Sequence, residues 1–510
     1  MDYPRASGVL LHPTSLPGRF GIGDLGKEAC AFVDFLAATG QRYWEILPLG
    51  PSGSSDSPYQ ARSALAGNTL LVSPERLLDE GFLVRKDLAD VPDFPEDRVA
   101  FKRVRPFKRK LLGKAYERFR KGGAAGLRAE FDDFCLRHAA WLDDYALYRA
   151  LRDASGGIVW NQWEEGLARR DPAALRDARE RLGEQVEAEK FAQFLFFRQW
   201  ASLREHCRQR GIRIFGDVPI FVAHDSADVW THPDQFKLDA RGAPRVMAGV
   251  PPDYFSSTGQ IWENPVYDWD RMKADGFPWW IARIRAALDM VDVARVDHFR
   301  GFLASWEIPG GDPTAERGQW VTAPGRELFE ALRAALGDLP LVAEDLGTIT
   351  PDVDALREAC GFPGTRVLQF AFSEDSTGRD LPHNYPRNVV AYTGTHDNNT
   401  VVGWIGSRAG VDSTRSEEQV RRECELALKY VGCRDRKEIH WDFIRAVFAS
   451  AAHTAIVPIQ DVLGMGPESR MNVPGTRTGN WAWRLRPGSI SDEACARLRE
   501  MTELYGRLPG

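Results

Sequence analysis

The chain has few of the features that mark secreted or membrane-bound proteins. Its 510 residues include seven cysteines, which are scattered and form no C-x-x-C pair, whereas secreted disulfide frameworks use even, clustered sets. No apolar stretch reaches the roughly 18 residues of a membrane span, and the N-terminus lacks the basic and apolar segments of a signal peptide. These absences predict a protein of a reducing compartment, and we expect a cytoplasmic location without membrane attachment.

Basic surface patterns and the common nucleotide motifs are also missing. The net charge is -6, and the one basic run, 102–110, lies beside acidic helices, so we expect a solvated face and no nucleic-acid partner. No G-x-x-x-x-G-K-[ST], H-E-x-x-H or G-x-S-x-G motif occurs. Residues 21–26 fit G-x-G-x-x-G, but Pro13 and Pro17 separate them from the preceding strand, and Glu45 lies inside its strand. Both facts argue against a dinucleotide site.

The chain does contain a large apolar fraction in alternating strand and helix patterns. Hydrophobic residues make up 43% and aromatic residues 11%, enough for a large core. Strands are predicted at 7–12, 42–48, 212–218, 291–297, 340–344, 366–371, 389–393 and 455–460. Amphipathic helices are predicted at 27–39, 187–210, 277–290, 325–336, 352–359 and 416–430. The alternation predicts an α/β fold, a (β/α)8 TIM barrel that forms one catalytic domain over 1–510.

Three segments are too long to be simple connectors between these elements. Residues 49–186, after the second strand, are predicted to form an inserted, mostly helical subdomain, with charged helices near 98–121, 124–139 and 141–153. Residues 247–270 and 463–481 mix proline, glycine and aromatic residues. Loops of that length in a compact domain tend to be functional. We therefore expect both to be active-site loops over the C-terminal face of the barrel.

Four predicted strands end in a carboxylate, at Asp217, Asp297, Glu344 and Asp397. The carboxyl ends of barrel strands share one mouth, so these side chains are expected to meet there. Arg295 lies two residues before Asp297 on the same strand face, which predicts a depressed pKa and an ionised Asp297 suited to nucleophilic attack. Glu344, flanked by apolar residues, is expected to have a raised pKa and to act as a general acid. Asp217 is expected to have a supporting role, either orienting Arg295 or holding the floor of the site.

Polar and aromatic residues near these strand ends favour a sugar ligand. The hydrogen-bonding groups around Asp397 match vicinal sugar hydroxyls better than a metal, because His396 has no second histidine at a ligand spacing. Tyr59 and Trp262 lie among turn residues, where aromatic planes can stack on sugar rings. Each feature alone also fits an ordinary ion pair, turn or core aromatic. Their coincidence at strand ends favours a barrel enzyme acting on sugars, without metal or organic cofactor.

Motifs in a fixed order carry a resemblance to a known family. They include Leu11-His12-Pro13-Thr14-Ser15-Leu16-Pro17-Gly18, Gly216-Asp217-Val218-Pro219, Gly249-Val250-Pro251-Pro252-Asp253-Tyr254-Phe255, Arg295-Val296-Asp297-His298, Ala343-Glu344-Asp345-Leu346-Gly347 and Gly394-Thr395-His396-Asp397-Asn398. With these motifs the chain resembles the amylomaltases, the 4-α-glucanotransferases (disproportionating enzymes) of glycoside hydrolase family 77, which are related to the α-amylase clan.

The resemblance implies roles for particular residues. Asp297 would be the nucleophile, Glu344 the general acid/base and Asp397 the transition-state stabiliser. Substrate-binding or supporting roles are implied for Tyr59, Asp217, Trp262, Arg295, His298, His396 and Asn472, with Tyr59 at an acceptor-side or secondary glucan site. The long loops resemble a pair that closes over the glucan. The implied substrates are α-1,4-glucans such as maltooligosaccharides and amylose, with glucose, and the implied state is a monomer or small homo-oligomer.

Two other functions stay open from the residues alone. The first is an α-glucan hydrolase of the amylase type, since the choice between water and a sugar acceptor depends on how the loops exclude water. The second is a non-catalytic glucan-binding protein that kept the fold. The three carboxylates argue against the second alternative, and only the family resemblance argues against the first.

Overall fold

Eight parallel strands form the centre of the computed structural model, which describes residues 5–53, 55–123, 125–253, 256–373, 376–410 and 413–509. They are β1 (Ala6–Leu10), β2 (Tyr43–Glu45), β3 (Arg213–Val218), β6 (Val293–Val296), β9 (Leu341–Ala343), β10 (Gly364–Val367), β11 (Val389–Tyr392) and β12 (Thr454–Pro458). Their order is β10-β11-β12-β1-β2-β3-β6-β9, and every pairing is parallel. All eight predicted strands are confirmed, with ends shifted by a few residues.

The ring of strands is nearly closed between β9 and β10. There the Ala343 N–H donates to the Pro363 carbonyl at 2.8 Å, and the Thr365 hydroxyl donates to the Ala343 carbonyl at 3.0 Å. Close approach inside the ring requires Gly8, because a Cβ at that position would lie 2.6 Å from the Tyr43 Cβ. Most strand residues are buried, as expected for a parallel sheet covered by helices. The predicted TIM-like barrel is confirmed.

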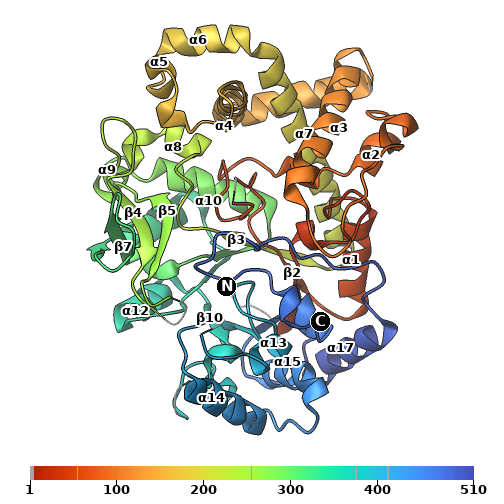
Figure 1. The fold of residues 1–510 in the computed structure, drawn as a ribbon, viewed down its shortest axis with the longest axis vertical. Coiled ribbons are helices and arrows are strands. Elements are labelled where there is room, and N and C mark those ends of the chain that lie inside the picture. Colours follow the sequence, from red (N-terminus) through yellow and green to blue (C-terminus); the bar gives the residue numbers. More distant parts are fainter. Residues whose placement is uncertain are drawn as a thin grey trace.

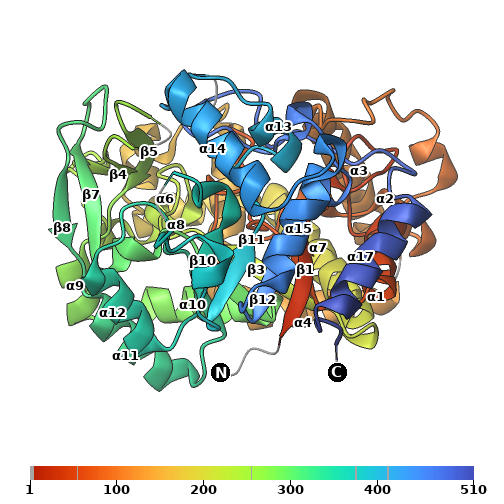
Figure 2. The same cartoon turned by 90° about the horizontal axis from the view of Figure 1, so that it is seen from below.

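Helices surround the strands, as Figure 2 shows from below. They include α1 (Lys27–Ala38), α10 (Pro278–Met290), α11 (Gly325–Leu336), α12 (Pro351–Cys360), α14 (Glu417–Tyr430), α15 (Ile439–Ala449) and α17 (Asp492–Leu504). In α11 the buried Leu328, Phe329 and Leu332 follow the i, i+1, i+4 spacing of one helical face. Amphipathic periodicity located α1, α10, α11, α12 and α14 correctly, because each packs one apolar face on the barrel, whereas α15 and α17 were not predicted.

The connection from β2 to β3 carries the large helical insertion, which Figure 1 shows grouped at one end of the molecule. It contains α2 (Pro74–Asp79), α3 (Phe101–Arg120), α4 (Arg128–Ala154), α5 (Glu165–Ala168), α6 (Pro172–Arg181) and the first part of α7 (Gly183–Gln209). The prediction of separate helices at 124–139 and 141–153 is wrong, since α4 is one helix of 27 residues. Residues 138–142 contain no glycine or proline, and Phe134 and Phe194 hold α4 against α7 with ring centroids 5.8 Å apart.

A second sheet lies beside the barrel mouth, and it was not predicted. Its antiparallel strands are β4 (Val246–Val250), β5 (Gln260–Pro265), β7 (Ala304–Pro309) and β8 (Gln319–Thr322), in the order β5-β4-β7-β8. The prediction of an irregular loop over all of 247–270 is therefore wrong. The strand partners are supplied by β7 and β8, far along the chain, and a local pattern does not reveal such pairing. Tyr254 and Phe255 lie outside the described residues.

Candidate active site

The carboxyl ends of adjacent strands bring the predicted acidic residues together. Asp217 of β3 pairs in register with Arg295 of β6, and Val296 pairs with Ala343 of β9. The chain continues this pairing beyond the strands, since the Glu344 N–H donates to the Val296 carbonyl at 3.0 Å. Strand register therefore places the side chains of Asp217, Asp297 and Glu344 at one mouth of the barrel.

One buried guanidinium holds two of these carboxylates. Arg295 Nη1 lies 2.7 Å from Asp217 Oδ2 and 2.9 Å from Asp297 Oδ1. The Arg295 side chain is 5% exposed, that of Asp217 is fully buried, and that of Asp297 is 26% exposed. Of the two carboxylates that Arg295 contacts, Asp297 is therefore the more accessible one, and Arg295 holds it in position.

The expectation of a depressed pKa at Asp297 is wrong. Burial of the carboxyl, with the charges of Asp217, Glu344 and Asp397, raises the pKa of Asp297 above its ordinary value. Arg295 acts in the opposite direction, but its charge is shared with Asp217. The sequence spacing identified the guanidinium and did not reveal how many carboxylates it serves.

Glu344 is held by two backbone N–H groups. His298 N donates to Glu344 Oε2 at 2.7 Å, and Leu346 N donates to Oε1 at 2.8 Å. Burial raises the pKa of Glu344, while Arg295 and the two hydrogen bonds oppose the rise. The predicted rise is thus confirmed. Because His298 directly follows Asp297, the first of these bonds also brings the Glu344 carboxyl next to the Asp297 segment.

His298 adopts a conformation that is rare for a side chain other than glycine. Its φ is 50° and its ψ is 52°, in the left-handed region. Trp262 packs edge-on against the imidazole at 4.8 Å between ring centroids. Burial, and next the charge of Arg300, lower the pKa of His298 to about 3, so the ring is neutral near neutral pH. Strained, buried residues of this kind cluster at functional sites.

The 463–481 loop contacts Asp397 directly. Asn472 Nδ2 donates to Asp397 Oδ1 at 2.6 Å, and Arg470 donates to the Asp397 carbonyl at 2.7 Å. His396 Nε2 lies 3.4 Å from the same carboxylate, and burial lowers the pKa of this histidine. The Asp397 side chain remains 40% exposed. Loop and strand end thus form one unit around an accessible carboxylate.

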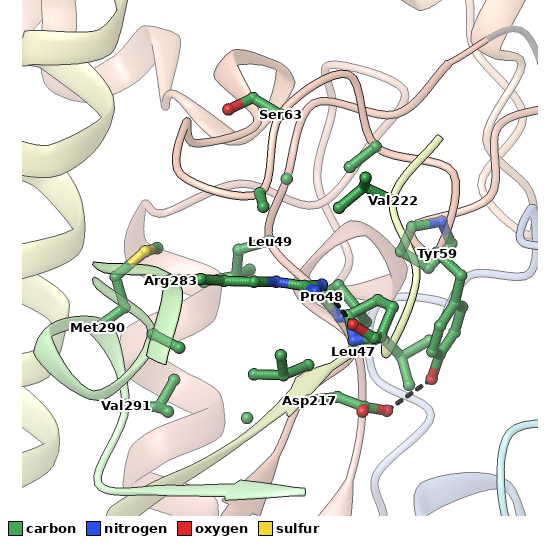
Figure 3. Close-up of a pocket in the computed structure, with 18 of the residues that line it drawn as sticks. Leu47, Pro48, Leu49, Tyr59, Ser63, Asp217, Val222, Arg283, Met290 and Val291 are labelled. Carbon is green, nitrogen blue, oxygen red and sulfur yellow. Dashed lines mark hydrogen bonds between the residues drawn. The ribbon is translucent and has the colours of Figure 1, made fainter. Parts of the chain in front are cut away.

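Tyr59 lies inside this cluster of polar residues. Its hydroxyl donates to Asp217 Oδ2 at 2.6 Å, as Figure 3 shows, and its ring stacks on His396 at 5.1 Å. Trp481 packs against the same two rings, 5.7 Å from Tyr59. These contacts place Tyr59 beside the carboxylate cluster and not at a separate surface site.

A mostly apolar cavity of about 80 Å³ borders the site on the other side of Asp217 (Figure 3). Leu49, Met290 and Val291 form part of its wall, and Arg283 contributes a polar group. Asp297, Glu344 and Asp397 do not line it. The cavity therefore lies next to the carboxylate cluster, and the three proposed catalytic carboxylates are not part of its wall.

The sequence prediction missed one buried carboxyl beneath the cluster, that of Glu45. Glu45 lies in β2, is 2% exposed, and interacts electrostatically with Arg295 and Asp217. The available signal was a glutamate within a short apolar strand, at a position where the side chain points into the barrel.

Comparison with known proteins establishes the family. The sequence profile of the 4-alpha-glucanotransferases, glycoside hydrolase family 77, matches residues 11–490. The chain belongs to the 4-alpha-glucanotransferase family. A 4-alpha-glucanotransferase of Synechocystis sp. is 50% identical over 506 residues, which cover 99% of this chain and 98% of the relative. One of Thermus thermophilus is 48% identical over 510 residues, covering 100% of both chains.

The fold agrees with a solved structure of the same family. The amylomaltase from Streptococcus agalactiae, in complex with acarbose, is 40% identical, with a TM-score of 0.93 and coverage of 99% of this chain and 100% of that one. The predicted family, fold and enzyme class are therefore confirmed. This chain is a 4-alpha-glucanotransferase that acts on α-1,4-glucans.

Proposed function

We propose that the enzyme transfers α-1,4-glucan segments by a retaining double displacement, with Asp297 as nucleophile, Glu344 as general acid/base and Asp397 as transition-state stabiliser. The contact of Arg295 with Asp297, beside a Glu344 held by two N–H groups, is the observation that carries this assignment. Glu344 lies close enough to Asp297 for its charge to raise the pKa of Asp297. The reactive form of the pair holds one proton, on Glu344.

In the first step, an Asp297 oxygen attacks the anomeric carbon of an α-1,4-linked glucose unit. Glu344 gives its proton to the glycosidic oxygen, whose bond to the anomeric carbon breaks, and the leaving glucan departs with a free 4-hydroxyl. The product is a β-glucosyl ester of Asp297. Arg295 compensates the charge of Asp297 before the attack and keeps the carboxylate oriented.

In the second step, the ionised Glu344 takes the proton of an acceptor 4-hydroxyl. The acceptor oxygen bonds to the anomeric carbon, the ester bond breaks, and Asp297 is released with the α configuration restored. Asp397, held by Asn472, accepts hydrogen bonds from sugar hydroxyls that strengthen as the ring gains oxocarbenium character. Trp262 and Tyr59 supply aromatic surfaces near the sugar.

The finer identity of the substrates is part of the proposal. Maltooligosaccharides and amylose would be donors, and a second glucan or glucose the acceptor. The acarbose complex of the related amylomaltase supports an α-glucan-like ligand at this site. We also retain the predictions of a monomer or small homo-oligomer and of a reaction without metal or cofactor.

A cytoplasmic location is a further proposal. The seven cysteines are all free and dispersed through the chain, as expected of a reducing compartment. Within the described part of the chain, none of the helices combines the length and apolar character needed to cross a bilayer.

Asp297→Asn tests the nucleophile. The amide keeps the shape of the side chain but cannot form the ester, so we expect turnover to fall by about three orders of magnitude or more with glucan affinity largely retained. Asp177→Asn, an exposed change in α6 of the insertion, is the matched control and should leave turnover unchanged. Initial rates with maltotriose and glucan binding by calorimetry measure both. Wild-type turnover by Asp297→Asn would refute the assignment.

Incubation of the pure enzyme with maltotriose separates the three candidate functions. Transfer conserves the number of reducing ends and yields glucose with a ladder of longer glucans. Hydrolysis adds one reducing end per cleavage and yields shorter sugars only. A binding protein without catalysis leaves maltotriose unchanged. We expect the ladder and a constant number of reducing ends.

A further inference from the structure

Glu45 is a buried carboxyl inside the barrel, one layer of side chains below the reacting groups. In β2 its neighbour Trp44 points outward, since its indole packs against Phe32 of α1 at 5.2 Å. Glu45 therefore points inward, and it pairs in register with Phe215 of β3. Asp217 lies two residues further along β3 on the same face. Glu45 thus lies directly beneath the Asp217 and Arg295 side chains.

Charged and titratable groups reach Glu45 from three strands. They are Arg295 of β6, Asp217 of β3 and Tyr392 of β11. The neighbouring β1 and β12 read Ala-Ser-Gly-Val-Leu and Thr-Ala-Ile-Val-Pro and bring no titratable side chain. Arg295 is therefore the one cation among the groups that act on Glu45. Its guanidinium already serves Asp217 and Asp297.

Several polar atoms in this interior lack partners. Within the described residues, Glu45 Oε2 and Asp217 Oδ1 are buried and have no hydrogen-bond partner, and the Tyr392 hydroxyl lies close enough to the Glu45 carboxyl to affect its pKa. Buried polar atoms of this kind cost free energy unless a donor and an acceptor meet. With both carboxyls ionised, the Tyr392 hydroxyl would be the one donor among these three groups, and the carboxylate oxygens would be acceptors in excess. A proton on Glu45 adds the donor that this group needs.

The electrostatics of the interior agree with a neutral Glu45. Burial raises the pKa of Glu45 to about 8, with Asp217 adding to the rise and Arg295 opposing it. If Glu45 were ionised, it would be a third carboxylate beside the single guanidinium of Arg295, and its charge would lack a compensating cation in the barrel interior.

We propose that Glu45 is a positioning residue for the transfer reaction: its neutral carboxyl and the Tyr392 hydroxyl support the Asp217 and Arg295 pair from inside the barrel and keep the guanidinium committed to Asp297. When Glu45 loses its proton, the new charge attracts Arg295 toward the interior, and Asp297 loses part of its counter-charge. Glu45 touches no substrate and acts only through Arg295. The inference rests on the proposed role of Asp297.

Two substitutions at Glu45 separate positioning from mere packing. Glu45→Gln keeps the shape and can still donate and accept hydrogen bonds, but it cannot ionise. We expect its kcat at pH 6 to be within about threefold of wild type, and its fall in activity above pH 8 to be shallower. Glu45→Leu fills the space without hydrogen bonds, and we expect kcat to fall about tenfold or more while KM changes less than about threefold.

Two tyrosine variants complete the test. Tyr392→Phe removes the hydroxyl that faces Glu45 and should lower kcat in the same direction as Glu45→Leu. Tyr43→Phe is the matched control, since Tyr43 also points inward from β2 and is fully buried, but Arg42 and Arg213 are its charged neighbours. It should leave kcat and the pH profile unchanged. The measurement is the initial rate of maltotriose disproportionation from pH 5 to 10, with circular dichroism to check folding.

Two results for Glu45→Gln would overturn the inference. The first is a wild-type pH profile. The second is a loss of activity as large as that of Glu45→Leu, because the charge of Glu45 would then be needed. If Glu45→Leu does not fold, Glu45→Gln and Tyr392→Phe decide. Loss of activity in Asp297→Asn together with a wild-type profile for Glu45→Gln would refute only the role of Glu45. Activity in Asp297→Asn would instead refute the proposed function itself.

Discussion

Tyr59 joins two parts of the site with one side chain. Its hydroxyl donates to Asp217, which in turn accepts from Arg295, and its ring stacks on His396 beside Asp397. The hydroxyl therefore contacts the part of the cluster that contains Asp217 and Arg295, and the ring contacts the part beside Asp397. The two contributions can be removed one at a time.

We expect Tyr59→Phe to lower kcat about tenfold, because Asp217 loses a hydrogen bond while the stacked ring remains. Tyr59→Ala should lower kcat further and raise KM, since the ring contacts with His396 and Trp481 are also lost. Initial rates with maltotriose at several concentrations distinguish the two effects. Equal kinetics for the two variants would contradict a separate role for the hydroxyl.

At the residue scale, the identities of the acidic groups could be predicted and their protonation could not. Alternation along β6 placed Arg295 and Asp297 on one face, as the 2.9 Å contact bears out. The pKa of Asp297 depends on Asp217, Glu344 and Asp397, which come from other strands. Spacing along one strand carries no information about these charges.

An exposed ion pair joins the 463–481 loop to strand β5, which lies more than 190 residues earlier in the chain. Arg477 Nη2 of the 463–481 loop lies 2.6 Å from Glu263 Oε1 of β5, and the side chains are 88% and 63% exposed. Glu263 has a φ of 61°, rare for a residue other than glycine. The same two segments carry Asn472, which holds Asp397, and Trp262, which packs on His298.

We expect Arg477→Ala to change the free energy of unfolding by less than about 1 kcal/mol, since exposed ion pairs contribute little. The loss of the link should loosen the 463–481 loop against β5 and raise the share of water as acceptor by about two- to fivefold. New reducing ends from maltotriose measure that share. Arg486→Ala removes another exposed pair, with Asp97, and is the control. An equal effect of the two substitutions would contradict a role for the loop link.

At the element scale, periodicity located the barrel strands and helices because each buries one face against the same core. The same reasoning divided α4 into two helices, although α4 is continuous over 27 residues. It also missed β7 and β8, which pair with segments more than 50 residues away or with each other. Those strands depend on tertiary partners and not on a local pattern.

The stability of the whole molecule should fall on the acid side because of buried histidines. His12 is 6% exposed, and burial, followed by the charge of His396, lowers its pKa to about 3. In the unfolded chain the ring binds a proton near its ordinary pKa of 6.5. The stabilisation is therefore present above pH 6.5 and is lost as pH falls toward 3.

We expect the free energy of unfolding to decline by as much as about 1.4 kcal/mol per pH unit for each such histidine. His12→Gln removes the ring that binds a proton in the unfolded chain. The free energy of unfolding of this variant should therefore depend less steeply on pH between 4 and 6 than that of the wild type. Urea unfolding at several pH values measures the slope. Identical slopes for the two proteins would contradict a buried neutral His12.

The sequence by itself determined the alternation of strands and helices, the family, and which carboxylates stand at strand ends. These features are local, because they depend on residue spacing along single elements. Only the tertiary structure decided that Arg295 serves two carboxylates, that Tyr59 reaches Asp217, and that Glu45 lies beneath them. Hydrogen bonds, burial and shared charge arise between segments up to several hundred residues apart, and the folded barrel is what brings those segments into contact.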